Sequence, residues 1–475
     1  MNMQNQAPPQ IKIKAPIVEA LQQALENPTY QFHIPGHTKG QGANPEFKKL
    51  IGKKALVVDT TDEFDNLGTL HPATGPIKEA LELAAKAFGA KRTFFLLNGS
   101  TVGNLAIAMG LTRKGQKIIT NRNCHRSVLT GMIISGAEPL WLIPNRLDDW
   151  GIWGNISPES VETMLEEHDD VAMVWITNPT YEGVVSDIRT ISAICKKHNV
   201  PLIVDEAHGS LWHFNKNLPI SSLELGADAV VHSLHKTGGS MSQSSMLHIG
   251  QNSTLDDEKI EKSLKLLHTT SPSLMLLASL DASRANLQSP LGKAQLTRAI
   301  SNAKYLRKRI DAMPNVHQLK QDFGYKTDIT KIFIKVDGLS GKRLESILEI
   351  DFKIEVESAS DKGLLLLSNI GNKRSDFEYL ANYLEQIAQR NYTDICHLEN
   401  KKHMPMLTPI IKMSLQEAFY ADKETIAKAN AVGRISAEVI AECPPGIAIL
   451  LPGELILAEH LAYLNDYECI EVVKG

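Results

Sequence analysis

The chain has 475 residues and a formal net charge of −4 at pH 7, with 43% hydrophobic and 22% charged residues. This length exceeds one ordinary hydrophobic core, so we expect a globular protein of two or three domains. The near-balance of charge gives no indication of a nucleic-acid or anionic-membrane partner, and no apolar run approaches the length that crosses a bilayer.

The cysteines and histidines indicate the cellular compartment and whether a metal site is expected. The five cysteines are scattered and odd in number, and the N-terminal segment lacks the apolar core of a signal peptide, so we expect a cytoplasmic protein. The 16 histidines fall in no metal-ligand pattern such as HExxH, so no metal site is expected.

Residues 1–69 are expected to form an N-terminal arm and turn-rich loops. A helix should begin at Pro16, because the apolar residues that follow fit one helical face. Four acids lie close together near the end of this segment. They suit either a solvated loop with local turns or a loop at the mouth of a site that attracts a cationic ligand. The four are Asp59, Asp62, Glu63 and Asp65.

Short apolar runs alternate with helical periodicity from about residue 70 to residue 250. This alternation predicts a doubly wound α/β domain with parallel strands, and we place this major domain at residues 70–310. Residues 244–249 could add an antiparallel neighbour strand. Helices are expected at 76–88 and 188–198. The expected parallel strands are 93–97, 117–120, 138–143, 171–177, 202–204 and 228–231.

The first of these strands breaks into Gly99, Ser100 and Thr101 before an apolar helix. A strand, a Gly-Ser-Thr turn and a helix make a phosphate cradle, because free backbone amides, the helix dipole and two hydroxyls all favour an anion. The turn lacks the GxxxxGK[ST] pattern of nucleotide sites, which favours a single phosphate. An ordinary Ser/Thr helix cap is the alternative interpretation.

Two later strands end in groups that suit pyridoxal 5'-phosphate (PLP). Asp205 ends the 202–204 run, and Lys236 follows the 228–231 run. Ligands of open parallel sheets bind beyond the carboxyl ends of the strands, so these two residues plausibly share one crevice. PLP needs a lysine for its aldehyde and an acid for its pyridinium nitrogen. His125, in the loop after another strand, sits where a ring could lie flat on a planar cofactor.

The pattern changes at Lys331. Strands expected at 332–336, 352–356 and 364–367 alternate with helices at 342–348 and 375–389. This indicates a small α+β domain, which we place at residues 311–395. A last unit, residues 396–475, should contain a helix (414–419), a proline-rich turn (443–447) and a strand (448–451).

Taken together, these segments resemble the short form of the bacterial Orn/Lys/Arg decarboxylase family, on the fold-type-I PLP scaffold of aspartate aminotransferase. The resemblance spans nearly the whole chain in the family's order, without the N-terminal wing domain of longer members. Cys443 stands where an aromatic residue would be expected. The matching segments are HIPGHTKG (33–40), DEFDNLGTLHPATGPI (62–77), LNGSTVGN (97–104), NCHRS (123–127), TNPTYEG (177–183), DEAHG (205–209), SLHKT (233–237), TTSPS (269–273) and PPGIAILLPGE (444–454).

The resemblance implies a role for each matched residue. Lys236 would bind the PLP aldehyde covalently, Asp205 would pair with the pyridinium nitrogen, and His125 would stack on the ring. His208 would lie near the phenolic oxygen of the ring. The phosphate would be held by Ser100, Thr101, Ser233 and His235. The catalytic group would then be Lys236, Asp205, His208 and His235. Candidates for gripping the distal cation of the substrate are Glu454, Asp62, Glu63 and Asp65.

These parts predict a PLP-dependent α-decarboxylase of a basic amino acid, which supplies agmatine, cadaverine or putrescine to polyamine biosynthesis. Arginine, lysine and ornithine all suit an acid at the end of the pocket, with a slight preference for arginine from the compact form of the chain. Lys236 or a nearby histidine would return a proton to Cα. Because this scaffold usually builds its sites at a dimer interface, we expect a homodimer or a higher assembly of dimers.

Two other functions stay open. One is a PLP-dependent aminotransferase or β-eliminating lyase, in which Arg374 could clamp the α-carboxylate of the substrate. The other is an inactive decarboxylase-like subunit that binds a partner and carries no PLP.

Overall fold

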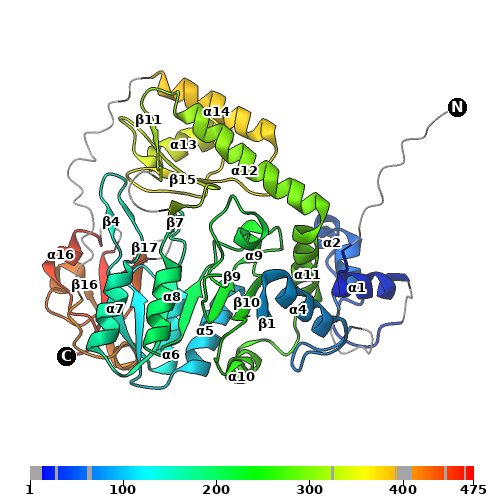
Figure 1. The fold of residues 1–475 in the computed structure, drawn as a ribbon, viewed down its shortest axis with the longest axis horizontal. Coiled ribbons are helices and arrows are strands. Elements are labelled where there is room, and N and C mark those ends of the chain that lie inside the picture. Colours follow the sequence, from blue (N-terminus) through cyan, green and yellow to red (C-terminus); the bar gives the residue numbers. More distant parts are fainter. Residues whose placement is uncertain are drawn as a thin grey trace.

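The computed structural model describes residues 13–26, 30–60, 67–321, 326–390, 392, 409–442, 447–464 and 467–475. These residues form a large α/β unit around a central sheet, a smaller α+β unit above it in the view of Figure 1, and a C-terminal unit at its left side. The first helix of the chain packs at the opposite side of the large unit from the C-terminal unit.

A seven-stranded sheet forms the centre of the large unit, in the strand order β1-β10-β9-β8-β6-β2-β3. Neighbouring strands from β9 to β3 pair in parallel, whereas β10 is antiparallel to both β9 and β1. The prediction of a parallel α/β sheet with an antiparallel strand near residues 244–249 is therefore confirmed. The strands are β1 (Ala90–Leu96), β2 (Lys117–Asn121), β3 (Glu138–Leu142), β6 (Val171–Thr177), β8 (Leu202–Asp205), β9 (Ala229–His232) and β10 (Ser245–Gly250).

Helices cover both faces of this sheet, because successive side chains of a strand point to opposite sides. Ile119 packs in a core with α1, α4, α7, α8 and α11, whereas its neighbour Ile118 packs with α5, α6 and α10. Each helix thus buries an apolar stripe against the sheet, as a doubly wound fold requires. The helices are α1 (Pro16–Glu26), α4 (Gly75–Phe88), α5 (Gly99–Leu111), α6 (Arg126–Ser135), α7 (Pro158–Glu167), α8 (Ile188–Lys197), α10 (Asp257–Leu267) and α11 (Leu274–Gln288).

The smaller unit is an antiparallel sheet, in the order β11-β13-β15-β14, that packs against three helices. It has its own apolar core, in which strand residues such as Ile334 meet helix residues such as Leu384. Its elements are α12 (Pro290–Ile310), β11 (Val316–Gln318), β13 (Lys331–Val336), α13 (Gly341–Phe352), β14 (Ser358–Ala359), β15 (Leu364–Leu367) and α14 (Arg374–Ala388).

The strand expected at 352–356 is wrong. Helix α13 continues to Phe352, and Lys353 then adopts a left-handed conformation (φ 56°) that caps the helix. The amide of Lys353 donates to the carbonyl of Glu349, and that of Ile354 donates to Leu348. These backbone amides close the helix end and are not available to a strand ladder, so pairing starts only at Ser358.

Two short strands join the large and the small unit. β7 (Val184–Val185) follows the carboxyl end of β6 in the large unit, and β12 (Lys326–Thr327) precedes β13 of the small unit. They pair antiparallel, with Thr327 opposite Val184, and the amide of Asp328 donates to the carbonyl of Gly183 at 2.9 Å. This pairing seats the first residues of β13 over the edge of the large sheet.

The C-terminal unit has two small antiparallel pairs and a separate apolar core. The turn expected at Cys443 lies outside the described residues, and the strand expected at 448–451 is present as β18. Its elements are α15 (Leu415–Tyr420), β16 (Lys423–Ala427), η3 (Lys428–Asn430), β17 (Ile440–Glu442), β18 (Ile447–Leu450), α16 (Ala458–Leu461) and β19 (Cys469–Val473). The other short elements are α2 (Pro45–Ile51), α3 (Lys53–Val58), β4 (Arg146–Leu147), β5 (Ile152–Trp153), η1 (Trp212–Phe214) and α9 (Leu234–Thr237).

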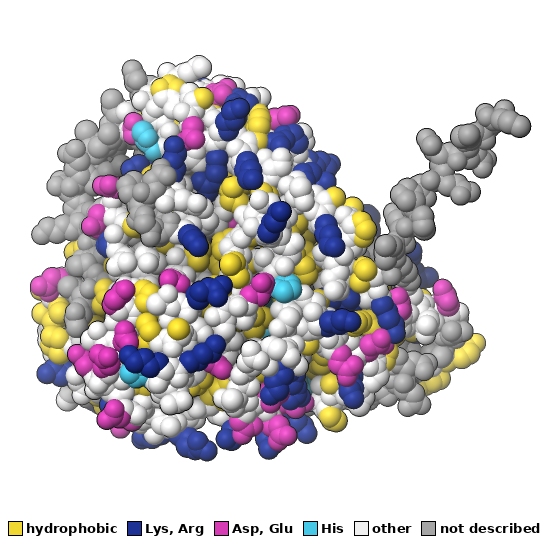
Figure 2. Space-filling view, viewed as in Figure 1, with side chains coloured by type: hydrophobic (Ala, Val, Ile, Leu, Met, Phe, Trp, Pro, Cys, Tyr) yellow, Lys and Arg dark blue, Asp and Glu magenta, His cyan; other side chains and the backbone are white. Residues whose placement is uncertain are grey.

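The surface carries mixed charge. On the face drawn in Figure 2, Lys and Arg side chains are interspersed with Asp and Glu. Within the described part of the chain, no helix combines the length and the apolar character needed to cross a bilayer.

Candidate active site

A cavity of about 400 Å³ lies beyond the carboxyl ends of β6, β8 and β9, where Thr177, Asp205 and Ser233 meet. The parallel strands place their ends at one edge of the sheet, so residues far apart in the sequence converge here. All eight residues expected to hold a cofactor line this cavity. They are Ser100, Thr101, His125, Asp205, His208, Ser233, His235 and Lys236.

Asp205 ends β8 at the floor of the cavity and is held in one orientation. Its Oδ2 accepts from the side-chain amide of Asn104 at 3.1 Å, and its Oδ1 accepts from the backbone amide of Ala207 at 3.2 Å. The same amide of Asn104 also donates to Ser127, whose Oγ lies 2.7 Å from Nδ1 of His125. One network therefore orients both the acid and the ring expected to stack on a cofactor.

Helix α5 presents an uncapped N-terminus to the cavity. Its capping residue Asn98 makes no side-chain cap and instead accepts from the Gln243 side chain at 3.1 Å. The hydroxyls of Ser100 and Ser233 lie 2.7 Å apart beside it. At Gly99 (φ +65°) a Cβ atom would meet nothing within 4 Å. An open helix end with two converging hydroxyls fits the phosphate of PLP.

His235 is oriented by the backbone. Its Nδ1 lies 2.8 Å from the carbonyl oxygen of Ser244, so Nδ1 carries the hydrogen and Nε2 is left without one in the neutral ring. Burial lowers the pKa of His235. A contact between His235 and a phosphate would therefore require the ring to bind a second proton.

Lys236 lies in α9, the single turn that follows β9, and its Nζ is 2.9 Å from Nε2 of His208. Burial lowers the pKa of Lys236, against the opposing effect of the Asp205 carboxylate. Burial also holds the pKa of His208 well below its usual value, and the positive charges of Lys331 and Lys236 add to this effect. The donor set thus fits PLP, with an amine for its aldehyde and a carboxylate for its ring nitrogen.

Three further side chains at this site were not expected from the sequence: Tyr181 and Glu357 line the cavity, and Lys331 contacts the lining residue His208. Nζ of Lys331 lies 2.9 Å from Nδ1 of His208, and the Tyr181 hydroxyl donates to Oε1 of Glu357 at 2.6 Å. The Tyr181 and His208 rings meet edge to face at 5.0 Å. Tyr181 lies within the segment 177–183 that resembles the family. Lys331 and Glu357 come from the small unit, and nothing in their local sequence indicates a site.

The structure does not bring Glu454 to the cavity, contrary to the expectation that it grips the substrate. Glu454 is 2% exposed, pairs with Arg122 at 3.0 Å and accepts from the amide of Leu451. Burial raises the pKa of this carboxyl, and Arg122 opposes the rise. The residue thus joins the C-terminal unit to the large unit. Asp62, Glu63 and Asp65 lie outside the described residues.

Arg374 also lies away from this cavity. Its guanidinium donates to the hydroxyl of Ser301 at 2.9 Å and stacks over the Tyr305 ring. It lines a separate surface hollow between α12 and α14. This placement removes the α-carboxylate clamp on which the aminotransferase alternative depended.

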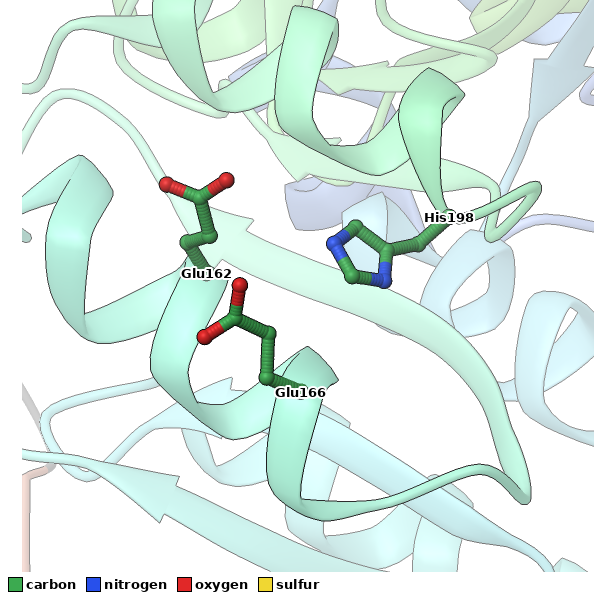
Figure 3. Close-up of side chains that lie close together, drawn as sticks. All are labelled: Glu162, Glu166 and His198. Carbon is green, nitrogen blue, oxygen red and sulfur yellow. The ribbon is translucent and has the colours of Figure 1, made fainter.

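One group of potential metal ligands occurs among the described residues, on the outer face of α7 and α8. Figure 3 shows Glu162 and Glu166 on one helix, with the His198 ring at the end of the next helix pointing toward them. Glu162 already pairs with Lys197 at 2.6 Å, and Glu166 is exposed. We therefore assign no metal to this group.

Comparisons with known proteins identify the family. The family model described as Orn/Lys/Arg decarboxylase, major domain, matches residues 15–333, and the C-terminal domain of the same family matches residues 398–471. The protein named arginine decarboxylase from Bacillus subtilis (strain 168) is 36% identical over 459 residues, covering 95% of this chain and 93% of that protein. One from Halalkalibacterium halodurans is 37% identical over 450 residues, covering 93% and 91%.

Among solved structures, constitutive lysine decarboxylase from E. coli superimposes with a TM-score of 0.85 at 23% identity, covering 97% of this chain and 82% of that one. Alanine–glyoxylate aminotransferase from Nostoc sp. shares the fold at a TM-score of 0.56 and 16% identity, covering 82% of this chain and 98% of that one. Fold, site and family models point the same way, and the chain belongs to the Orn/Lys/Arg decarboxylase family.

Proposed function

We propose that the chain is a PLP-dependent α-decarboxylase of a basic amino acid, with arginine as the preferred substrate and agmatine as the product. The observation that carries this proposal is the meeting of Lys236, Asp205 and the open end of α5 in one cavity. Family membership supports the reaction class, and relatives named arginine decarboxylase at 36–37% identity support the preference.

PLP supplies, when bound, an acceptor for the electrons of the bond between Cα and the departing carboxylate. Asp205 would keep the ring nitrogen protonated, and its own orientation depends on Asn104 and the Ala207 amide. His125 would close one face of the ring and exclude water from it. Lys236 or His208, which lie 2.9 Å apart, would return a proton to Cα after CO₂ leaves.

The distal cation of the substrate needs a carboxylate at the cavity. Besides Asp205, two carboxylates line it in the described part of the chain, Glu182 and Glu357. Burial raises the pKa of Glu182, which favours its neutral form. Glu357 is exposed at the mouth and is oriented by the Tyr181 hydroxyl, so we propose Glu357 as the group that meets the cation.

We further propose a homodimer that works in polyamine biosynthesis in the cytoplasm. The described cysteines Cys124, Cys195 and Cys469 are free thiols, which suits a reducing compartment. The exposed aromatic residues Tyr30 and Phe32, in the N-terminal segment, are suited to burial against a second copy.

A substrate panel tests the reaction. The PLP-loaded protein is incubated with arginine, lysine and ornithine, and CO₂ and the matching amines are measured. We expect agmatine to form fastest. A protein that binds PLP but releases no CO₂ from any of the three contradicts the proposal, and keto acid formed with pyruvate would instead indicate an aminotransferase. Absence of PLP absorbance and of borohydride labelling at Lys236 would indicate an inactive subunit.

A further inference from the structure

His208 lies between two lysines. Its Nε2 is 2.9 Å from Nζ of Lys236, and its Nδ1 is 2.9 Å from Nζ of Lys331. Lys331 is the first residue of β13 in the small unit, is 2% exposed, and also donates to the carbonyl oxygen of Tyr181 at 2.8 Å. The three side chains form an unbroken line from the small unit to the lysine expected to carry the cofactor.

The hydrogens along this line can be counted. A neutral imidazole has one N–H and one bare nitrogen, whereas an ammonium group only donates. Two ammonium groups would need two bare ring nitrogens, which the neutral ring of His208 does not have. One of the two lysines must therefore be an uncharged amine that accepts the ring N–H.

The surroundings of Lys331 favour its charged form. Its Nζ donates to the Tyr181 carbonyl, lies 5.5 Å from the centre of the Tyr181 ring, and is attracted by the carboxylates of Asp328 and Glu357. Burial lowers the pKa of Lys331 to about 8, which still leaves it protonated at neutral pH.

Lys236 has fewer acceptors for its hydrogens than Lys331 has. Asp205 and Glu357 attract its charge, but within the described part of the chain its Nζ is hydrogen-bonded to His208 alone. His125 and His235 are further titratable groups around it, and burial lowers the pKa of both, which favours their neutral forms. Lys236 is thus the lysine left to accept the ring N–H.

The absence of a side chain at Gly183 leaves space for the Lys331 side chain to reach His208. Gly183 has a φ of +98°, and a Cβ atom built there would lie 2.8 Å from Cδ and 2.9 Å from Cβ of Lys331. The carbonyl of Gly183 accepts from the amide of Asp328, next to the β7–β12 pairing. The Lys331 side chain therefore packs against the backbone of Gly183, and this close approach is possible only because residue 183 has no side chain.

We propose that Lys331 is a positioning residue. By donating to Nδ1 of His208 it turns the ring N–H toward Lys236, and so holds the Lys236 amine uncharged for attachment of the cofactor. In that attachment the Nζ lone pair attacks the aldehyde carbon, a C=N bond forms, and the aldehyde oxygen leaves as water with both amine hydrogens. This inference rests on the PLP binding proposed above.

The test is the pH dependence of cofactor attachment to the apoprotein, followed by the visible absorbance of PLP and by borohydride trapping at Lys236. In Lys331→Met we expect attachment at neutral pH to slow about tenfold and the midpoint of the profile to move up by about one pH unit, because Lys236 then keeps its proton. Lys331→Arg keeps the donor and the charge, and should retain the wild-type midpoint.

A matched control comes from the same strand. Lys335 donates to the carbonyl of Asp149 at 3.0 Å, outside the cavity, so Lys335→Met removes the same charge without touching His208. We expect no change in its attachment profile. In a His208→Phe background, Lys331→Met should cause no further shift. A full shift in that background would mean that the charge acts without the ring, and would overturn the proposal.

A second measurement on the wild-type apoprotein covers the case in which Lys331→Met does not fold. The ¹⁵N shifts of the His208 ring should show the hydrogen on Nε2, and a hydrogen on Nδ1 would overturn the inference. Failure of the proposed function looks different: the wild-type protein would then bind no PLP or release no CO₂. Wild-type loading and turnover with an unshifted Lys331→Met profile would refute this inference alone.

Discussion

Asn104 on α5 donates its side-chain amide to Oδ2 of Asp205, the last residue of β8, at 3.1 Å. Asn104 lies on α5, about one turn after Ser100 and Thr101 at the open end of that helix. One rigid helix therefore sets both the place of the anion cradle and the orientation of the acid.

Replacing Asn104 with Ala should lower kcat about tenfold or more and weaken PLP retention, because Asp205 loses the donor that orients it. Steady-state kinetics and PLP release on dialysis check this. Asn302 is a matched control, since it is equally buried in a helix and its side-chain amide has no partner among the described residues. Asn302→Ala should leave the cofactor spectrum unchanged. Equal loss in both variants would mean a general packing effect.

Replacing Glu357 with Gln should raise KM for arginine about tenfold and change kcat much less, because a charge-assisted contact to the distal cation is lost. Glu355 lies two residues earlier, is also exposed, and does not line the cavity. Glu355→Gln removes the same charge and should leave KM unchanged. A similar rise in both variants would indicate only general attraction of the cation, and would remove Glu357 as its specific partner.

Replacing Glu454 with Ala should destabilise the fold by about 3–5 kcal/mol, because it leaves the buried Arg122 guanidinium uncompensated. Urea unfolding monitored by circular dichroism measures this loss. Glu79 pairs with Lys14 on the surface, so Glu79→Ala should cost much less stability than Glu454→Ala. If folded Glu454→Ala protein keeps its stability but loses affinity for arginine, Glu454 contacts substrate after all.

Stability should fall in mild acid through His268. Burial, with His71 beside it, lowers the pKa of His268 to about 4, and the two rings are hydrogen-bonded at 2.8 Å. The unfolded chain binds this proton near pH 6.5 and the folded chain only near pH 4, so the unfolded state holds more protons between these values. The contribution of His268 to the free energy of unfolding is therefore fully present above pH 6.5. About 3 kcal/mol of it is lost as the pH falls toward 4.

His268→Gln removes this titration. The unfolding free energy of the wild type minus that of the variant should be about 3 kcal/mol smaller at pH 4 than at pH 7, and the variant should have the flatter profile. Parallel profiles would show that His268 titrates alike in the folded and unfolded states.

The amino-acid sequence alone determined the sheet and one wall of the site. Apolar runs of strand length predict β6, β8 and β9, and the rule that parallel strands end at one edge brings Asp205 and Lys236 together. The strand expected at 352–356 was the weak point. Residues Phe352 and Ile354 have strand-like side chains, but the left-handed cap at Lys353 ends a helix there instead.

Tertiary structure decided which residues form the opposite wall of the site and which of the acidic residues lie at it. Glu357 lines the cavity and Lys331 contacts His208 because β12 pairs with β7 and seats the small unit over the sheet. Glu454 does not line the cavity, because its carboxylate pairs with Arg122, 332 residues earlier in the chain. Local patterns specify elements and strand ends, since these depend on near neighbours. Contacts between units depend on how whole surfaces pack, and no short segment encodes that.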